Sequence, residues 1–102
     1  MLDQVRLIAR RYAEELERNR VRVTALYVFG SQAGDSPRLD SDIDVAVVSD
    51  SLSGDWFEDM RLLHRLRRDI DLRIEPVPFR PEDFGPSQPL YHQIVEDGVQ
   101  VI

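Results

Sequence analysis

Residues 29–48 read FGSQAGDSPRLDSDIDVAVV, and this stretch decides how the rest of the chain is interpreted. Apart from Asp44, its last six residues, Ile43 to Val48, form a continuous apolar run, which predicts a strand covered on both faces. Aspartates stand in and just before this strand: Asp35, Asp40, Asp42 and Asp44. Because Asp44 interrupts the apolar run, it needs a chemical explanation.

The residues on either side predict helices and strands in alternation. Apolar residues at helical spacing indicate a helix over residues 2–19, and β-branched and aromatic residues indicate a strand over residues 21–29. A second helix is expected over residues 52–68, with Asp55 as its cap and Glu58 three residues later in a capping box. We expect Trp56 to contribute to the buried face of this helix.

A third strand and a last short helix complete the expected fold. Alternation over residues 70–77 predicts the strand, with Asp71 near its start. Residues 76–89 hold five of the six prolines and predict a surface connector. A short helix over residues 90–96, ended by Gly98, follows, and an edge strand is expected after it.

This order of helix, strand, strand, helix, strand, helix predicts an α/β (α+β) fold with a small mixed sheet. We expect a single domain over residues 1–102. The chain has no cysteine, which excludes disulfides, thiolate zinc sites and cysteine nucleophiles. Residues 1–20 are too charged for a signal peptide, and no apolar run approaches the roughly 20 residues of a membrane span, so we expect a cytoplasmic protein.

The charge of the chain argues against general nucleic-acid binding. Its formal net charge is -6, whereas sequence-independent DNA or RNA binding depends on neutralising phosphates with basic side chains. All 13 basic residues are arginine, and we expect most of them to lie on solvated helix faces. No direct DNA binding is therefore expected, although a nucleotide carried with metal ions remains compatible with this charge.

The expected topology brings carboxylates together. The strands before and after residues 30–41 should be antiparallel neighbours, whereas the helical crossover makes the second and third strands parallel. The starting ends of the second and third strands are then adjacent, so Asp71 should approach Asp42 and Asp44. Two carboxylates about 6 to 7 Å apart repel by roughly 2 to 3 kcal/mol at an effective dielectric near 20. Either protonation, which raises the pKa values of the carboxyls, or a hard dication such as Mg²⁺ or Mn²⁺, which prefers oxygen ligands, would relieve this repulsion.

The aspartates could also serve a turn or a calcium loop. Asp40 and Asp42 could act only in the turn that enters the strand, where such residues are common. A calcium loop starting at Asp40 requires glycine at its sixth position and glutamate at its twelfth, but Val45 and Ser51 stand there. The calcium loop is therefore excluded, and a role in the turn stays open for Asp40 and Asp42.

Gly30 and Ser31 offer a phosphate site opposite the acids. A glycine after a strand lets the backbone approach a ligand closely, and the serine adds a hydroxyl. No lysine follows, which excludes a nucleoside-triphosphatase P-loop. The pair gains meaning from its spacing, because ten residues separate Ser31 from Asp42.

This spacing resembles the Gly-Ser-x10-Asp-x-Asp signature of the minimal nucleotidyltransferases, a branch of the DNA polymerase β-like superfamily. The matching motifs are Val28-Phe29-Gly30-Ser31, Ser41-Asp42-Ile43-Asp44-Val45, Ile70-Asp71-Leu72 and the tail Ile94-Val95-Glu96-Asp97-Gly98-Val99. The resemblance covers nearly the whole chain and implies a nucleotidyltransferase fold.

The resemblance also implies roles for individual residues. Asp42 and Asp44 would bind Mg²⁺ or Mn²⁺, Asp71 would be the third ligand and the base, and Gly30 with Ser31 would hold the phosphates of ATP. Many relatives have a basic residue and then glycine soon after the Gly-Ser pair, whereas this chain has Gln32-Ala33-Gly34-Asp35. Arg38 is a candidate to replace the missing positive charge at the phosphates.

Short members of this family commonly occur as antitoxins beside a HEPN-domain ribonuclease. The resemblance therefore implies an ATP-dependent adenylyltransferase that transfers AMP to a tyrosine of a HEPN-type toxin encoded nearby. The first alternative is an antitoxin or scaffold that acts by binding alone, because the loop after Ser31 is altered. The second alternative is nucleotidyl transfer to a small hydroxyl compound.

Overall fold

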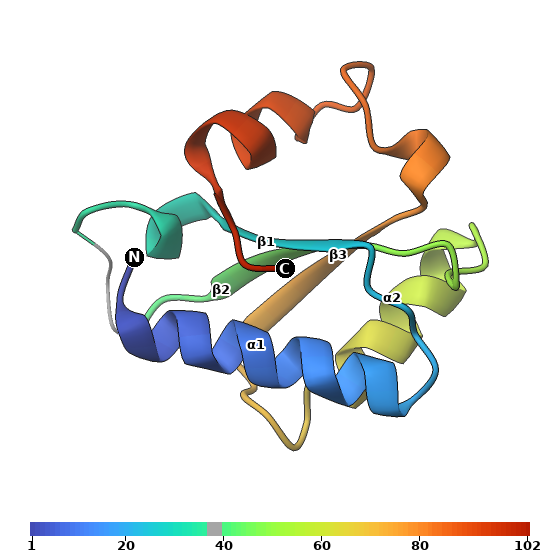
Figure 1. Cartoon of the computed structure of the whole chain (residues 1–102), viewed down its shortest axis with the longest axis horizontal. Coiled ribbons are helices and arrows are strands. Elements are labelled where there is room, and N and C mark those ends of the chain that lie inside the picture. The colour runs from blue at the N-terminus through green and yellow to red at the C-terminus, as the bar shows by residue number, and fades with distance from the viewer. Residues whose placement is uncertain (37–39) are drawn as a thin grey trace.

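A mixed sheet forms the centre of the structure (Figure 1). The computed structural model describes residues 1–36 and 40–102, and in these the sheet has four strands in the order β3-β2-β1-β4. The elements are α1 Asp3–Arg18, β1 Ala25–Phe29, η1 Gly30–Ala33, β2 Ile43–Val48, α2 Trp56–Leu66, β3 Ile74–Phe79, η2 Pro81–Asp83, η3 Gln93–Asp97 and β4 Val99–Gln100. The α/β fold with a small mixed sheet is confirmed.

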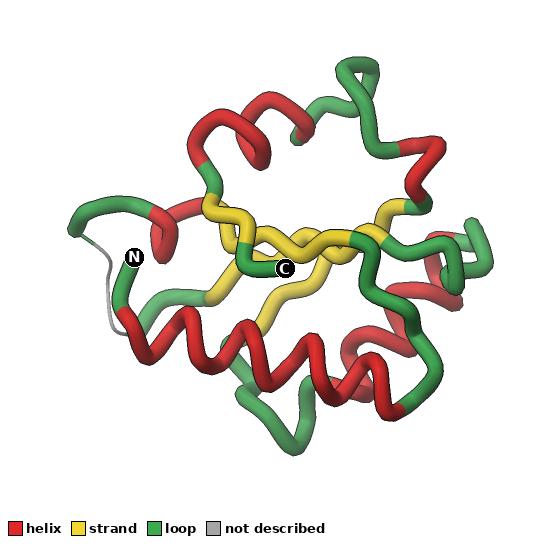
Figure 2. The backbone as a smooth tube through the Cα atoms, viewed as in Figure 1, coloured by secondary structure: helices red, strands yellow, loops and turns green. Residues whose placement is uncertain are grey.

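The strand directions agree with the sequence-based expectation. β1 and β2 are antiparallel neighbours, and β2 and β3 are parallel across the α2 crossover. β4 pairs antiparallel with β1 at the other edge, so the C-terminus returns to the sheet (Figure 2). The carboxyl end of β1 consequently lies beside the start of β2.

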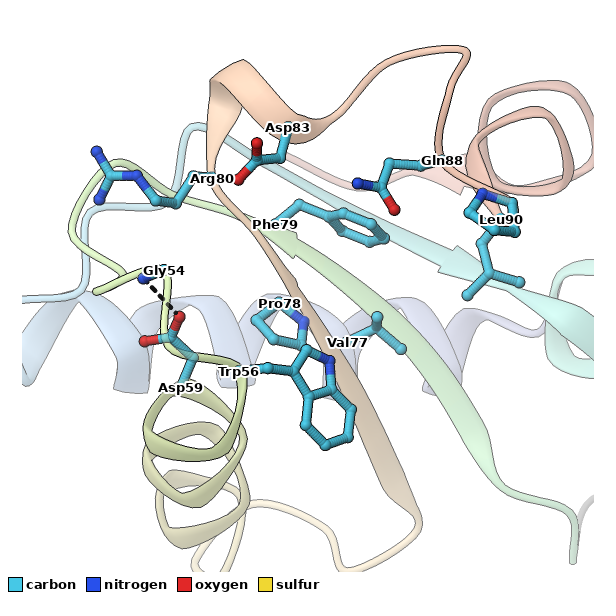
Figure 3. A pocket seen from close by; sticks show the side chains of 11 residues that line it. Gly54, Trp56, Asp59, Val77, Pro78, Phe79, Arg80, Asp83, Gln88 and Leu90 are labelled. Atoms are coloured by element: carbon cyan, nitrogen blue, oxygen red, sulfur yellow. Dashed lines mark hydrogen bonds between the residues drawn. The ribbon is translucent and has the colours of Figure 1, made fainter.

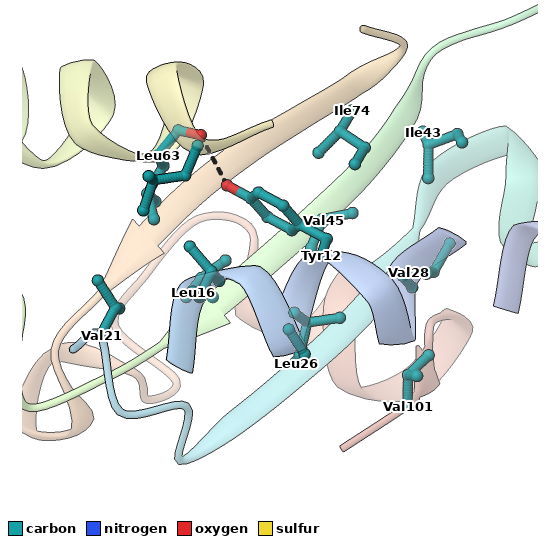
Figure 4. Close-up of a cluster of buried hydrophobic side chains, with 14 of the residues drawn as sticks. Tyr12, Leu16, Val21, Leu26, Val28, Ile43, Val45, Leu63, Ile74 and Val101 are labelled. Carbon is teal, nitrogen blue, oxygen red and sulfur yellow. Dashed lines mark hydrogen bonds between the residues drawn. The ribbon is translucent and has the colours of Figure 1, made fainter. Parts of the chain in front are cut away.

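Each face of the sheet has its own hydrophobic cluster. Ile43, Val45 and Val47 point toward α1 and α2, where they pack with Tyr12, Leu16 and Leu63 (Figure 4). Ala46 and Val48 point to the opposite face, which the C-terminal segment after β3 covers. Since successive side chains of a strand alternate, Asp44 shares the face of Ala46 and Val48.

The first strand begins later than predicted because residues 19–21 end α1. Arg20 has a φ of 65°, and its N–H donates to the carbonyl of Glu17 while the Val21 N–H donates to Leu16. These two bonds form a Schellman motif, in which Val21 and Leu16 are both buried and in the same cluster. The predicted start at Val21 is therefore wrong, and β1 begins at Ala25.

The third strand is also displaced from its predicted position. The Asp71 carboxylate accepts the Arg73 N–H at 2.8 Å, and the Ile74 N–H donates to the Asp71 carbonyl. This turn replaces the predicted strand at residues 70–73, and Leu72 is 66% exposed rather than packed inward. β3 therefore runs from Ile74 to Phe79, so Pro76 lies in the strand as predicted, and Pro78, which was predicted in the connector, lies in the strand as well.

α2 begins as predicted, but one of its side chains points outward. The Asp55 carboxylate accepts the N–H groups of Phe57 and Glu58, which confirms the cap. The Asp55 N–H donates to Ser53 Oγ, so Ser53 is the acceptor in place of the Glu58 side chain that a capping box would use. Trp56 is 55% exposed, so its predicted burial is wrong. None of the helices in the described residues has both the length and the apolar composition of a membrane span.

Candidate active site at the start of β2

Asp44 lies at the centre of the acidic group. Its register partners are Phe29 on β1 and Glu75 on β3, so the Asp44 and Glu75 side chains project from the same face of the sheet. Partial burial, followed by the negative charges of Asp42 and Glu75, raises the pKa of the Asp44 carboxyl. The group formed by Asp42, Asp44 and Glu75 is called the acidic group below.

Gly30 allows the backbone to pass directly beside Asp44. It has a φ of 72°, in the region that favours glycine, and it immediately follows β1. A Cβ added at Gly30 would overlap the Oδ2 atom of Asp44. The Gly-Ser bend and the Asp44 carboxylate are therefore in contact, as the sequence spacing predicts.

Polar side chains hold the loop between β1 and β2 against this bend. Ser31 Oγ and Ser41 Oγ share a hydrogen bond of 3.1 Å. Gln32 is completely buried, and its Nε2 donates to the carbonyl and the hydroxyl of Ser41 at 3.1 and 2.9 Å. Gln32 thus fixes the residue that precedes Asp42. Sequence reasoning missed this role, because nothing local marks a loop glutamine as buried.

The structure places Asp71 outside the acidic group. Asp71 lies in the turn before β3, and its carboxylate receives hydrogen bonds from the Arg73 side chain at 3.1 and 2.9 Å. These bonds lower the pKa of Asp71, and the charges that act on Asp44 come from Asp42 and Glu75. Asp71 is not among the groups whose charge acts on Asp44, and its role as ligand or base stays a prediction.

Glu75 is the acid that sequence reasoning missed. It stands on β3 directly beside Asp44, at the place where the third carboxylate was expected. Glu75 Oε1 lies 3.7 Å from Arg67 Nη1, and Oε2 lies 3.8 Å from His64 Nε2. The available signal was an acidic residue inside the strand itself, between Ile74 and Pro76.

The donor atoms of the acidic group suit a hard divalent cation. Within residues 1–36 and 40–102, no three Asp, Glu or His side chains are arranged so that they could together hold one ion. Mg²⁺ commonly takes only one or two carboxylates and completes its shell with water and substrate phosphates. Asp42 and Asp44, with their mutual repulsion and their contact with the Gly30 bend, fit this kind of site.

The other residues considered from the sequence, Asp35, Arg38 and Asp40, belong to the segment between β1 and β2. Arg38, the candidate phosphate ligand, lies outside the described residues. Asp35 and Asp40 are exposed on the loop between β1 and β2. The structure therefore leaves the prediction for Arg38 untested.

A hollow of about 540 Å³ lies along the second half of β3 (Figure 3). Its lining includes Trp56, Val77, Phe79 and Leu90. Val77 follows Glu75 by two residues, so both side chains lie on the same face of β3. The hollow therefore lies further along β3 than Glu75, and its lining includes none of the three acids of the acidic group.

The family comparison matches almost the entire chain. Residues 12–102 match the model of the family described as polymerase beta, nucleotidyltransferase. The chain belongs to this nucleotidyltransferase family. Membership supports a transferase type of reaction, and the family generally uses a nucleoside triphosphate and a divalent metal.

Two solved structures have the same fold as this nucleotidyltransferase domain. A candidate nucleotidyltransferase from Sulfolobus solfataricus has a TM-score of 0.67 and 19% identity, with 95% of this chain and 78% of that chain covered. A toxin-antitoxin structure with AMP-PNP has a TM-score of 0.63 and 23% identity, with 99% of this chain and 73% of that chain covered. Among curated proteins, none matches this sequence. At these identities the similarity establishes the fold alone.

Proposed function

We propose that this nucleotidyltransferase transfers AMP from ATP to a tyrosine hydroxyl of a HEPN-type toxin and thereby acts as its antitoxin. The observation that carries the proposal is the contact between the Gly30 bend and Asp44, with Glu75 on the next strand. The bend can hold phosphates, and the acids can hold the cation that accompanies them. The toxin-antitoxin structure with AMP-PNP, which has the same fold, supports the choice of partner and nucleotide.

The residues of the acidic group have separate roles in this reaction. Asp42 and Asp44 would hold Mg²⁺ or Mn²⁺, which when bound offsets the charge of the phosphates. Gly30 and Ser31 would hold the leaving pyrophosphate, with Arg38 as a further candidate. Glu75 lies on the opposite side of Asp44 from Gly30, where the acceptor hydroxyl must arrive for an in-line displacement.

The proposed step is a single displacement at phosphorus. The tyrosine oxygen forms a bond to the α-phosphorus while the bond from that phosphorus to the bridging oxygen breaks. Pyrophosphate leaves with the electron pair, and the Glu75 carboxylate accepts the proton of the hydroxyl. The products are the O-adenylylated tyrosine and pyrophosphate.

The proposal is tested by nucleotide binding and by transfer. ATP with Mg²⁺ at 100 times its dissociation constant should stabilise the wild type by about 2.7 kcal/mol, measured as a thermal shift. Asp44→Asn should abolish this shift and the labelling of the toxin by radioactive ATP. Asp35→Asn, which alters an exposed aspartate of the same loop, is the matched control and should retain both.

The third acid is tested by comparing Glu75→Gln with Asp71→Asn. If Glu75 accepts the proton, Glu75→Gln should lower the transfer rate by about 10²-fold or more while ATP still binds. Asp71→Asn should then leave the rate nearly unchanged. The reverse result would assign the role to Asp71, as the sequence resemblance implies.

Two alternative functions make different predictions. If the double variant Asp42→Asn/Asp44→Asn still neutralises the toxin, the chain acts by binding alone. The altered loop Gln32-Ala33-Gly34-Asp35 is the observation that favours this alternative. Transfer of the label to a small hydroxyl compound without any partner protein would instead support the second alternative, nucleotidyl transfer to such a compound.

A further inference from the structure

The positions of the acids define the side from which an acceptor approaches. Gly30 follows β1, Asp44 lies on β2 and Glu75 lies on β3, so the site extends toward the β3 edge of the sheet. If the phosphates lie at Gly30, as in the proposed function on which this inference rests, the acceptor enters over β3. α2 lies beside this strand.

The outward face of α2 is unusual for a surface helix. Phe57 is 76% exposed, and the turn after the helix presents Leu72 at 66% exposure. Arg61 and Arg65 follow Phe57 at intervals of four residues, which places them on the same side of the helix. Arg68 lies in the turn just after α2 and lines the same hollow as Arg61 and Arg65. We call Phe57, Arg61, Arg65, Arg68 and Leu72 the α2 docking surface.

The arginines of this surface have no acidic partner in the described part of the chain. Although the net charge is -6, no carboxylate among residues 1–36 and 40–102 forms an ion pair with Arg61, Arg65 or Arg68. Together with His64, Arg67 and Leu72 they line a hollow of about 510 Å³. On α1, Arg18 pairs with Glu15, whereas the other arginines of that helix form no ion pair within the described residues. The arginines after Phe57 are distinguished because they line one hollow that has no Asp or Glu in its lining.

The α2 docking surface is physically continuous with the acidic group. His64 and Arg67, which line the same hollow, both lie within 4 Å of the Glu75 carboxylate at the distances given above. Arg67 Nη1 also donates to the carbonyl of Ile74 at 2.9 Å, which fastens α2 to the edge of β3. A partner bound on α2 would therefore reach Glu75 directly.

We propose that the α2 docking surface binds an acidic, partly apolar face of the acceptor protein and so orients its hydroxyl toward Glu75. The guanidinium groups of the surface supply the charge complementarity, and Phe57 with Leu72 supply apolar contact. A nucleic acid is the less favoured occupant, because exposed apolar side chains frame the arginines and the acidic group beside them repels a phosphate backbone.

The test measures binding of a defined probe. The probe is a short fluorescein-labelled peptide of glutamate and leucine around one tyrosine, followed by fluorescence anisotropy at about 150 mM salt. Arg61→Glu/Arg65→Glu should weaken binding at least about tenfold, because two attractive contacts become repulsive. Arg10→Glu/Arg11→Glu, the same charge change on exposed residues of α1, should leave affinity within about twofold.

Two further variants separate charge, apolar contact and folding. Phe57→Ser keeps the charge and should also weaken binding. Arg61→Gln/Arg65→Gln removes the charges without reversing them and should give an intermediate loss of affinity for the peptide. This variant replaces Arg61→Glu/Arg65→Glu in the test if the glutamate variant unfolds. Trp56 is the only tryptophan of the chain and lies at the start of α2, so its fluorescence reports occupancy there.

Each outcome has a defined meaning. Equal affinity of the peptide for the wild type and for Arg61→Glu/Arg65→Glu overturns the proposal. Tighter binding of single-stranded oligouridylate than of the acidic peptide, lost in the same variant, also overturns it in favour of a nucleic-acid surface. The thermal shift with ATP and Mg²⁺ should be the same in the wild type and in all three arginine double variants. Absence of this shift in the wild type would reject the proposed function, whereas the docking surface is judged by peptide binding alone.

Discussion

Gly30 occupies a position that no other residue can take without disturbing the site. Its positive φ strains any L side chain, and its missing Cβ leaves the space that the Asp44 carboxylate fills. The glycine therefore serves the approach of two functional groups as well as the turn after β1.

Gly30→Ala should impair both folding and ligand binding. The added methyl group must displace the Asp44 carboxylate, so affinity for ATP with Mg²⁺ should fall by more than tenfold. The free energy of unfolding should fall by about 1 to 2 kcal/mol, because the left-handed conformation is costly for alanine. Calorimetry and urea unfolding measure the two effects. Gly85→Ala is the control, since its Cβ meets no atom within 4 Å, and equal behaviour of the two variants would contradict this account.

Asp71 has a clear structural role in the turn before β3. Its hydrogen bonds to Arg73 lower its pKa in the folded state, so they stabilise the fold when the carboxylate is charged. This stabilisation is complete above the pKa of the unfolded aspartate, near 3.9, and is lost as the pH falls through the lower folded-state pKa.

Asp71→Asn should therefore destabilise the protein at neutral pH and have little effect in strong acid. We expect a loss of about 1 kcal/mol at pH 7, measured by urea unfolding. The difference from wild type should shrink below pH of about 4. Asp69→Asn, at an exposed neighbour, should show no such pH dependence. A constant difference at every pH would exclude the Asp71–Arg73 pair as its cause.

At the scale of elements, the end of α1 carries avoidable strain. Arg20 stands at the left-handed position of the Schellman motif, where glycine is usually found. The motif is retained because it buries Val21 against Leu16 and satisfies the last carbonyls of the helix.

Arg20→Gly should stabilise the protein by about 0.5 to 1 kcal/mol, because relief of the left-handed strain exceeds the entropy that glycine adds to the unfolded chain. The melting temperature measures the effect. Arg22→Gly lies outside the left-handed region and should not stabilise. A lower melting temperature for Arg20→Gly would show that the arginine side chain contributes more than its strain costs.

The outer edge of the sheet is protected by two prolines. The Ile43 N–H donates to the carbonyl of Arg73, and the Ser49 N–H donates to the carbonyl of Phe79. The backbone N–H and C=O groups of the odd-numbered residues of β3 therefore point toward β2. Pro76 and Pro78 therefore occupy the outward positions, where a missing N–H breaks no bond of the sheet. This edge cannot readily accept another strand, which leaves side chains as the means of recognising a partner there.

At the scale of the whole molecule, the two clusters have different tasks. The cluster under α1 and α2 is the larger and includes Tyr12, whose hydroxyl donates to the carbonyl of Leu63 at 2.8 Å (Figure 4). The cluster on the opposite face holds the C-terminal segment over the sheet through Ile94, Phe29 and Phe79. The face that bears the acidic group thus depends on the smaller cluster.

Ile94→Ala should loosen this cover of the sheet. Ile94 is fully buried, so truncation should lower the free energy of unfolding by about 2 to 5 kcal/mol, measured by urea unfolding. Gln93→Ala, at an exposed residue of the same turn, is the control and should have little effect. A loss below about 0.5 kcal/mol, the range of ordinary surface substitutions, would mean that the C-terminal segment is held by other contacts.

Much of the fold follows from local patterns. The apolar run at Ile43 to Val48 defines β2, Asp55 caps α2, and the lengths of the connections determine which strands are parallel. The predictions fail where a side chain competes with the strand backbone. Val21 belongs to the helix end, and Asp71 makes a turn, because these interactions depend on geometry that hydrophobic alternation does not encode.

The sequence by itself indicated the family and the contact between the Gly-Ser bend and Asp44, because the spacing of these residues is fixed along one short stretch of chain. Only the tertiary structure decided which acid lies beside Asp44. Asp71 and Glu75 are both odd-numbered and share the same alternation, so the pattern does not distinguish them. The register of β3 against β2 distinguishes them, because it aligns Asp44 with Glu75 and leaves Asp71 in the turn before the strand.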